Sequence, residues 1–347
     1  MRAGIRSRPW AGIDIGSFSV KLLLAHGGGR FTAVEEILPP AGDAAPRPPD
    51  VIARAITSAL SRIGTGPRGL RGVSLGISGS DVIVKQIHLP LLDDDEVGPA
   101  LRFEARKHLP FDPQTMVIDF QVLNRLPSQK RLDVLVAAVP RERLEKVIAP
   151  LNHLDLEADI VDATPLALSN ALTHGEELGS GAWVLLDIGH QSSHLTLYQR
   201  GEPYFSRRLD FGGRTITQAI ATGTRVPLEE AEEWKLAAGS DEPGFRVDWN
   251  SREMQAVLES LRTDLAEELR RSFAFYRTLG QLPDPMRIWL SGGSARLPGL
   301  AARLGELLGA PVVLFDPLEK LLRGHAAAPA TPGPQFAQAY GLALRTV

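Results

Sequence analysis

Residues 12–24 read GIDIGSFSVKLLL, and residues 185–198 read LLDIGHQSSHLTLY. Both stretches contain an apolar run, the tripeptide Asp-Ile-Gly, a short polar turn and a second apolar run. Apolar runs separated by a glycine-containing turn predict a β-hairpin in each half of the chain. The repeat therefore predicts a duplicated α/β architecture, in which two hairpin turns face each other across a ligand site.

Composition sets the class of protein. The chain has 347 residues, 44% of them hydrophobic and 23% charged, which is typical of a globular protein of about two domains. A net charge of -3 gives no reason to expect a nucleic-acid partner. Cysteine is absent, which excludes disulfides, zinc-thiolate sites and thiol nucleophiles. No apolar stretch approaches the roughly 20 residues that span a bilayer, so we expect a cytoplasmic protein without direct membrane insertion.

Periodicity places helices and strands alternately along the chain. Strands are expected where short apolar or alternating runs lie between turns, and helices where apolar residues recur every three or four positions. The Ala/Pro/Gly-rich segment 326–334 is expected to be a loop. The predicted helices cover residues 51–63, 97–108, 141–152, 165–174, 215–222, 228–235 and 252–279.

The two turns carry the residue types that a nucleotide needs. Small residues let backbone N–H groups approach phosphates, and carboxylates hold Mg²⁺ through its water ligands. Asp14 in the first stretch and Asp187 in the second are therefore candidate metal-shell residues. The candidate phosphate contacts are Gly16, Ser17, Ser19 and Lys21 in the first turn, and Gly189, Ser192 and Ser193 in the second.

Two further segments complete the expected site. Gly292 and Gly293 follow a predicted strand and precede a helix, which suits contact with an adenine face and an α-phosphate. Glu232 and Lys235 lie three residues apart on a predicted helix, so both side chains can reach a ribose. Taken singly, each of these patterns is more often structural, and their order along one chain favours the functional interpretation. The remaining candidate nucleotide contacts are Phe18, Gln191, Gly212, Gly213 and Ser294.

The order of these segments is similar to that in the actin, sugar-kinase and heat-shock ATPase superfamily. Residues 82–123, VIVKQIHLPLLDDDEVGPALRFEARKHLPFDPQTMVIDFQVL, resemble more narrowly the PilM family of type IV pilus assembly proteins, itself similar to the division protein FtsA. Residues 161–172, VDATPLALSNAL, and 209–221, LDFGGRTITQAIA, carry the same resemblance. The resemblance extends from about residue 10 to residue 347.

This resemblance implies an α/β, FtsA-like fold of two lobes, built from duplicated ribonuclease-H-like domains with an inserted α+β subdomain. The first actin-like domain would comprise residues 10–83, completed by 163–178 and 335–347. The inserted subdomain would comprise 84–162, and the second domain 180–334, with a nucleotide-clasping helical part at about 214–280.

The resemblance also implies a function. It predicts an ATP-binding scaffold, with Mg²⁺, that binds the cytoplasmic N-terminal tail of a PilN-type protein within the inner-membrane assembly complex. The chain would then be peripheral to the inner membrane through its partner. The expected peptide groove lies between the first domain and the inserted subdomain. Its predicted lining residues are Leu101, Arg102, Phe103, Glu104, Leu109, Pro110 and Phe111.

One segment departs from the family pattern. The second turn has His190 and Gln191 where the family usually has small residues, so we expect crowding of a β-phosphate or side-chain contacts in place of backbone ones. His190 and His194 are not expected to bind one metal ion, because four extended residues span about 13 Å. The sequence contains no identifiable residue to position an attacking water, so at most weak ATPase activity is expected.

Other functions remain as alternatives. A small-molecule kinase of the same superfamily needs a carboxylate base in the cleft, and the two candidates, Asp119 and Asp162, lie in strand-like segments. A type II secretion or FtsA-like assembly protein is a second alternative. FtsA has an amphipathic tail after its last helix, which is not expected here because the sequence ends at GLALRTV. The sequence leaves open whether the chain forms a homo-oligomer.

Overall fold

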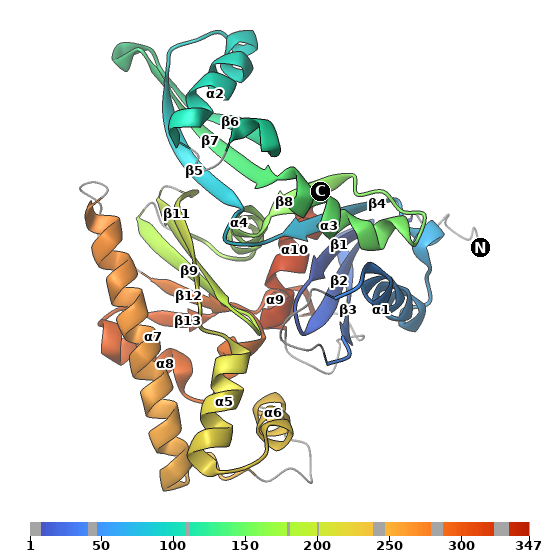
Figure 1. Ribbon diagram of the computed structural model, residues 1–347, viewed down its shortest axis with the longest axis vertical. Helices are drawn as coiled ribbons and strands as arrows, with labels where there is room; N and C mark the ends of the chain where they lie inside the picture. Colours follow the sequence, from blue (N-terminus) through green and yellow to red (C-terminus); the bar gives the residue numbers. More distant parts are fainter. Residues whose placement is uncertain are drawn as a thin grey trace.

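The structure is a computed structural model that contains two five-stranded sheets and one three-stranded sheet in its described part. Figure 1 shows the three-stranded sheet projecting from one end of the molecule and the two larger sheets side by side below it. The chain is described at residues 8–40, 47–108, 112–178, 181–199, 201–238, 247–278, 287–322 and 333–346.

The first large sheet begins with the hairpin strands that the opening sequence predicts. Its apolar side packs against α1 (Pro49–Arg62) and α3 (Arg141–Asn152), with Leu22, Ile56 and Leu151 in one core cluster. Its strand order is β3 (Arg30–Ile37), β2 (Ser19–His26), β1 (Trp10–Ile15), β4 (Gly72–Ile77) and β8 (Ile160–Ala163).

The second large sheet packs against a separate set of helices. Its core joins the sheet to α5 (Gly213–Thr224), α7 (Arg252–Thr278) and α8 (Leu300–Leu308), while α6 (Leu228–Ala237) packs on α5. Its strand order is β11 (Glu202–Leu209), β10 (Ser193–Gln199), β9 (Ala182–Ile188), β12 (Ile288–Ser291) and β13 (Val312–Leu314).

Both large sheets have the same topology. In each sheet three consecutive strands form antiparallel hairpins, and the first of them also pairs in parallel with a later strand. The register aligns the repeats as well, because Asp14 pairs with Lys21 across the first hairpin and Asp187 pairs with His194 across the second. The predicted duplication is therefore present in the topology and in the register.

Two helices fill the space between the large sheets. Helices α4 (Thr164–Gly175) and α10 (Ala337–Ala343) share one core cluster with residues of β2, β9 and β12, and α9 (Pro317–Leu322) borders them. The approach is close, because a Cβ atom at Gly341 would lie 1.7 Å from Ala167 O, and one at Gly12 would lie 2.2 Å from Ala339 O. Only glycine at these two positions allows this layer to pack against both neighbours.

The three-stranded sheet has its own small core with α2 (Asp94–His108), and its order is β5 (Ile83–Pro90), β7 (Arg131–Pro140) and β6 (Met116–Leu126). The next elements, α3 and β8, pack with the first large sheet instead, because β8 pairs with β4. We therefore propose that the inserted subdomain ends near Pro140 and not at residue 162.

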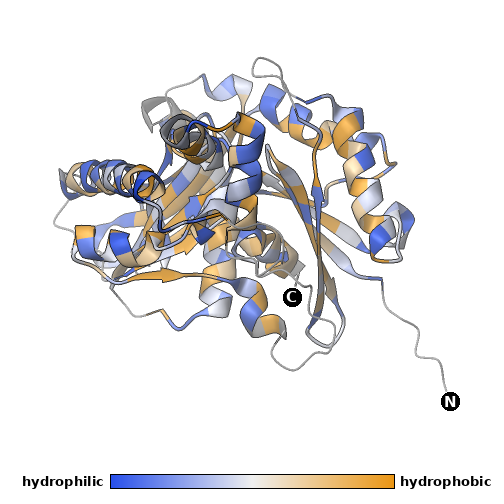
Figure 2. Cartoon of the chain, turned by 90° about the horizontal axis from the view of Figure 1, so that it is seen from below, coloured by the Kyte–Doolittle hydropathy of each residue, from blue (hydrophilic) through white to orange (hydrophobic). Residues whose placement is uncertain are grey.

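The helices have the mixed composition of elements with one buried face. Figure 2 shows hydrophilic and hydrophobic residues interleaved along them. Among the helices of the described segments, none combines the length and the apolar character that crossing a membrane requires.

Candidate functional site

The two hairpin turns close in the same way. Gly16 N donates to Ser19 O at 3.0 Å, and Gly189 N donates to Ser192 O at 3.2 Å. A Cβ atom would lie 3.0 Å from the acceptor oxygen in the first turn and 2.8 Å from it in the second. Glycine therefore fits both positions best, because a side chain would crowd the closing carbonyl, more severely at Gly189 than at Gly16.

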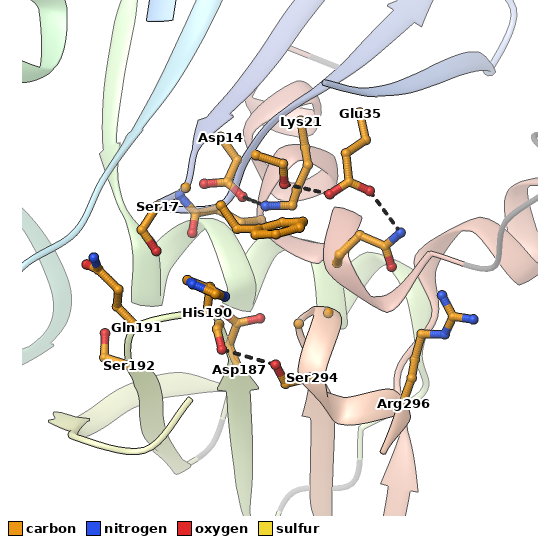
Figure 3. A pocket seen from close by; sticks show the side chains of 18 of the residues that line it. Asp14, Ser17, Lys21, Glu35, Asp187, His190, Gln191, Ser192, Ser294 and Arg296 are labelled. Atoms are coloured by element: carbon orange, nitrogen blue, oxygen red, sulfur yellow. Dashed lines mark hydrogen bonds and ion pairs between the residues drawn. The ribbon is translucent and has the colours of Figure 1, made fainter. Parts of the chain in front are cut away.

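The turns face each other across a cavity of about 360 Å³, which is within the usual range for small-molecule sites. Figure 3 shows residues of both turns directed into it. The cavity brings together most of the residues predicted from the sequence. They are Asp14, Gly16, Ser17, Phe18, Ser19, Lys21, Asp187, Gly189, Gln191, Ser192, Glu232, Lys235, Gly292, Gly293 and Ser294.

Two partly buried carboxylates, Asp14 and Asp187, lie next to the turns. Burial raises the pKa of Asp14, although Lys21 opposes this shift from 3.5 Å away. Burial likewise raises the pKa of Asp187, against the effect of a hydrogen bond from Ser291 Oγ to Asp187 Oδ1 at 2.8 Å. The environment therefore disfavours two neighbouring negative charges, and a cation bound between them would relieve both.

The two halves differ at the position that pairs with the aspartate. Lys21 occupies it in the first hairpin and His194 in the second. Burial, aided by Arg208, lowers the pKa of His194 to about 4, so this imidazole is neutral at pH 7. The first half of the cavity is therefore the side that offers a cation beside the aspartate.

Lys235 and Glu232 join α6 to the start of α5. Lys235 Nζ donates to Glu232 Oε2 at 2.7 Å, to Thr217 Oγ1 at 2.9 Å and to Gly213 O at 3.1 Å. Thr217 Oγ1 also bonds Glu232 Oε2. The other carboxylate oxygen, Glu232 Oε1, is buried and has no hydrogen-bond partner within the described chain. It is an acceptor without a donor, which a ligand hydroxyl would satisfy.

The segment after β12 forms another part of the cavity wall. Gly292 has a φ of +87°, and a Cβ atom there would lie 2.4 Å from Ile188 O. Ser294 Oγ donates to Gly189 O at 3.2 Å, which ties this segment to the second turn. The apolar end of the cavity lies beyond it and is lined by Ile216, Leu236, Ala238 and Leu297, with Arg296 beside them.

An aromatic contact joins the two turns. The rings of Phe18 and His190 have centroids 5.2 Å apart, and burial together with Lys235 lowers the pKa of His190. Arg47, in the segment before α1, donates to Ser17 O at 2.8 Å and so braces the first turn from outside. Sequence analysis identified His190 as a departure from the family pattern, and the structure places its ring against Phe18.

Some predicted nucleotide contacts lie behind the cavity. Ser193 is fully buried and donates to Phe211 O at 2.6 Å, so its hydroxyl is directed away from the cavity. Gly212 and Gly213 do not line the cavity, but a Cβ atom at Gly212 would lie 2.7 Å from His190 O and one at Gly213 2.7 Å from Ser294 Oγ. These three residues support the second turn and leave the wall of the cavity to their neighbours.

The predicted peptide-groove residues are only partly described. Leu101 is 2% exposed in the core of the small sheet, so the prediction that it lines a groove is wrong. Phe103 is 69% exposed and Glu104 is half-buried. The Arg102 side chain and the whole of Leu109, Pro110 and Phe111 lie outside the described residues.

The two acids considered for a kinase do not line the cavity. Asp119 bonds the backbone N–H of Phe120 on an exposed strand. Asp162 is buried and lies 3.3 Å from Arg345 Nε. Neither carboxylate is placed to act as a base in the cleft.

Sequence analysis missed several cavity residues. Glu35 accepts from Ser19 Oγ at 2.5 Å and from Gln335 Nε2 at 3.3 Å, so it joins residues from opposite ends of the chain. One indication of this residue was available in the sequence: Glu35 lies on a predicted strand next to the first hairpin, and in the structure it pairs with Lys21. The other missed lining residues are Ile15, Ile37, Ser78, Ile216, Leu236, Ala238, Arg296, Leu297, Gln335 and Gln338.

Comparison of the sequence with models of known protein families identifies the family of this chain. A model of the family described as Type IV pilus assembly protein PilM matches residues 12–347. The chain belongs to the PilM family. A solved PilM–PilN type IV pilus biogenesis complex contains a chain that is 29% identical, with a TM-score of 0.79 over 96% of this chain and 97% of that chain.

More distant relatives share the fold of the PilM family. FtsA of Bacillus subtilis is 25% identical over 190 residues, 50% of this chain and 42% of FtsA. The chain spans about half the length of the first curated relatives it matches. MreB5 of Spiroplasma citri bound to AMPPNP is 13% identical, with a TM-score of 0.51 over 89% of this chain and 91% of that chain. Together these likenesses confirm the predicted actin-like fold.

Proposed function

We propose that this PilM-family chain is an ATP-binding scaffold of type IV pilus assembly, located on the cytoplasmic side of the inner membrane. One observation carries the proposal: a single cavity joins two glycine-closed turns, two partly buried aspartates and the Glu232–Lys235 pair. A phosphate chain needs the backbone N–H groups of such turns, and a ribose needs a carboxylate acceptor.

The donor set of the cavity fits ATP in one arrangement. The phosphates would lie between the turns beside Lys21, and the ribose would satisfy Glu232 Oε1. The base would then reach the apolar end formed by Leu236, Ala238 and Leu297. Adenine is large, flat and mainly apolar at its faces. The apolar end therefore suits it better than the charged part of the cavity beside Asp14, Lys21 and Asp187 does.

Mg²⁺ fits the same arrangement. Asp14 and Asp187 are the two carboxylates whose pKa values are raised by burial at the floor of the cavity. Mg²⁺ keeps several water ligands and usually takes one or two carboxylates together with substrate phosphates. Within the described residues, no group of three or more His, Cys, Asp or Glu side chains is arranged to bind a metal ion. We propose that Asp14 and Asp187 hold the ion through its waters.

The proposed partner is the N-terminal cytoplasmic tail of a PilN-type inner-membrane protein. Support comes from the similar chain of the PilM–PilN complex and from the exposed Phe103 on α2 of the small sheet. The candidate contacts are Arg102, Phe103, Glu104, Leu109, Pro110 and Phe111. Nucleotide between the lobes would modulate this interaction, because β11 of the second lobe contacts β5 of the small sheet.

Isothermal titration with ATP and Mg²⁺ tests the nucleotide proposal. We expect micromolar binding by the wild type, and binding about tenfold weaker for Glu232→Gln, which retains the shape of the side chain but loses its charge. Glu142→Gln is the matched control, because Glu142 is an exposed glutamate paired with Lys146 on α3. Absence of ATP binding by the wild type would refute the proposal.

Fluorescence anisotropy with a labelled PilN-type N-terminal peptide tests the partner. We expect Phe103→Ala to weaken binding at least fivefold, because exposed aromatic side chains often carry much of the energy of an interface. Phe275→Ala is the control, since Phe275 is 51% exposed on α7. Equal loss in both variants, or no binding by the wild type, would contradict the proposed groove.

A further inference from the structure

Arg262 is a buried charged residue on α7, where this helix meets the segment that precedes α8. It is 7% exposed and lies one helical turn from the buried residues Leu258 and Leu265. Burial lowers the pKa of its guanidinium, although Glu259 opposes this shift. Burying a charge in an apolar environment is costly unless it is well paired, so its contacts need an explanation.

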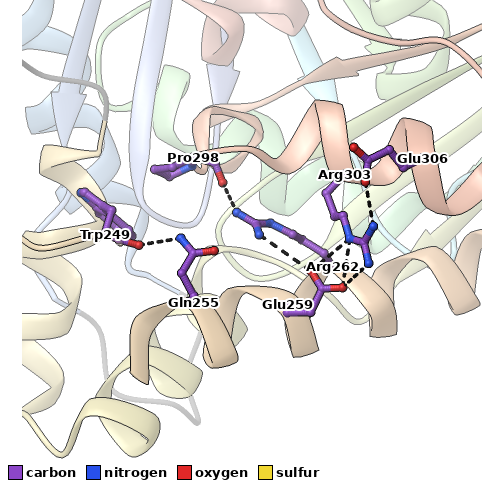
Figure 4. Close-up of polar contacts among 7 residues, drawn as sticks. All are labelled: Trp249, Gln255, Glu259, Arg262, Pro298, Arg303 and Glu306. Atoms are coloured by element: carbon purple, nitrogen blue, oxygen red, sulfur yellow. Dashed lines mark hydrogen bonds and ion pairs between the residues drawn. The ribbon is translucent and has the colours of Figure 1, made fainter. Parts of the chain in front are cut away.

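The closest partner of Arg262 is a backbone carbonyl. Figure 4 shows the guanidinium directed at Pro298, and Arg262 Nη2 donates to Pro298 O at 2.5 Å. Glu259 Oε2 is 3.9 Å from Nη1, and Nε is buried without a hydrogen-bond partner in the described segments. A methionine would fill similar space without this desolvation cost, so stability alone does not account for a guanidinium here.

Pro298 ends the segment that forms one wall of the cavity. Gly299 follows with a φ of +66°, and a Cβ atom there would lie 2.9 Å from Arg262 Nη2. Between β12 and Pro298 the chain is held by short backbone bonds, from Ala295 N to Gly292 O at 3.1 Å and from Leu297 N to Ser294 O at 3.3 Å. A displacement at Pro298 is therefore transmitted to the cavity wall.

We propose that Arg262 is a positioning residue that sets the base-contacting edge of the cavity, formed by Arg296 and Leu297, through its hydrogen bond to Pro298 O. The proposal rests on the proposed nucleotide function. It assigns to α7, which does not line the cavity, a part in choosing which nucleobase is bound. Arg262 would act mainly on the base, because the first turn is held by β1 and β2 and the second by β9 and β10, and the bond from Ser294 Oγ to Gly189 O is the side-chain link from this segment to the second turn.

The same helix pair contains a matched control. Arg303 on α8 binds Glu259 through Nε at 2.9 Å and 3.1 Å and through Nη2 at 2.5 Å, and it also pairs with Glu306. These side chains are more exposed than Arg262, and none of these bonds reaches the segment from Gly292 to Pro298. Loss of Arg303 therefore loosens the packing of α7 on α8 without releasing Pro298.

Titration of the full chain with ATP and with CTP, each with Mg²⁺, tests the proposal. We expect the wild type to bind ATP about tenfold more tightly than CTP, which corresponds to about 1.4 kcal/mol. Arg262→Met should bring this ratio close to one, mainly by weakening ATP, and Arg262→Lys should restore part of it. Arg303→Met should lower the melting temperature and leave the ratio unchanged.

The outcomes separate this inference from the proposed function. If the wild type binds neither nucleotide, the proposed function fails. If it binds both equally, or if Arg262→Met weakens both by the same factor or neither, the role of Arg262 is wrong and the nucleotide site stands. If Arg262→Met does not fold, Gly299→Ala is tested in its place, because the Cβ added at residue 299 would displace the Arg262 guanidinium. An unchanged ratio of ATP to CTP affinity in Gly299→Ala would overturn the proposed role of Arg262.

Discussion

Removal of the Phe18 ring should open the cavity to nucleotide. The rings of Phe18 and His190 meet between the two turns, where a phosphate chain must contact both backbones. An aromatic pair contributes about 0.5–1.5 kcal/mol beyond its buried area. If this contact must separate before phosphates enter, Phe18→Ala strengthens ATP binding by the equivalent factor, about 2-fold to 13-fold.

The assay is isothermal titration of ATP with Mg²⁺ into the wild type, Phe18→Ala, His190→Ala and the double variant. The double-mutant cycle should give a coupling that accounts for most of the gain, because either substitution removes the same ring contact. Phe275→Ala provides the control, since its ring lies 5.5 Å from Phe205 away from the cavity. Unchanged or weaker ATP binding by Phe18→Ala, or strictly additive effects, would refute the reasoning.

Two further predictions concern stability. Asp187→Asn should raise the melting temperature at pH 7, because burial raises the pKa of this carboxyl and its ionised form therefore costs free energy in the fold. That cost is absent when the pH is below the pKa of the unfolded state, and it grows as the pH rises towards the raised pKa of the folded state. The increase in melting temperature of Asp187→Asn should therefore shrink towards pH 4. An increase that does not change between pH 4 and pH 7 would contradict this prediction. Gly341→Ala should destabilise the protein by about 3 kcal/mol in denaturant titration, since its Cβ would lie 1.7 Å from Ala167 O. Gly66→Ala, with no heavy atom within 4 Å of the added Cβ, should be nearly neutral, and similar losses in both variants would disprove the packing argument.

The parts of the structure that depend on local sequence were predictable. The hairpins around Asp14 and Asp187 follow from apolar runs and glycine turns, and the 141–152 helix agrees with α3 at both ends. The pairing of β8 with β4, on which the proposed end of the inserted subdomain rests, was not predictable, because a periodic pattern shows that β8 is a strand but not which sheet it joins.

The unpredicted part of the site depends on contacts between distant segments. Glu35 meets Gln335 only because α10 and the segment before it return to the first sheet. Arg262 reaches Pro298 only because α7 packs beside α8. Leu101 was assigned to a groove from a motif that is equally typical of a buried helix face, and its burial shows that the motif contributes to the core.

Lys21 and His194 occupy equivalent positions in the two hairpins, and burial lowers the pKa of His194 to about 4, so that its imidazole is neutral at pH 7. A duplicated cleft with identical halves would offer an elongated anion two equal orientations. Beside the two aspartates the cavity instead has a lysine in one hairpin and a neutral imidazole in the other, so the two turns offer a bound anion different surroundings. The difference between Lys21 and His194 thus makes two hairpins of the same topology chemically unequal. The ends of one bound ligand would therefore meet different side chains in the two lobes.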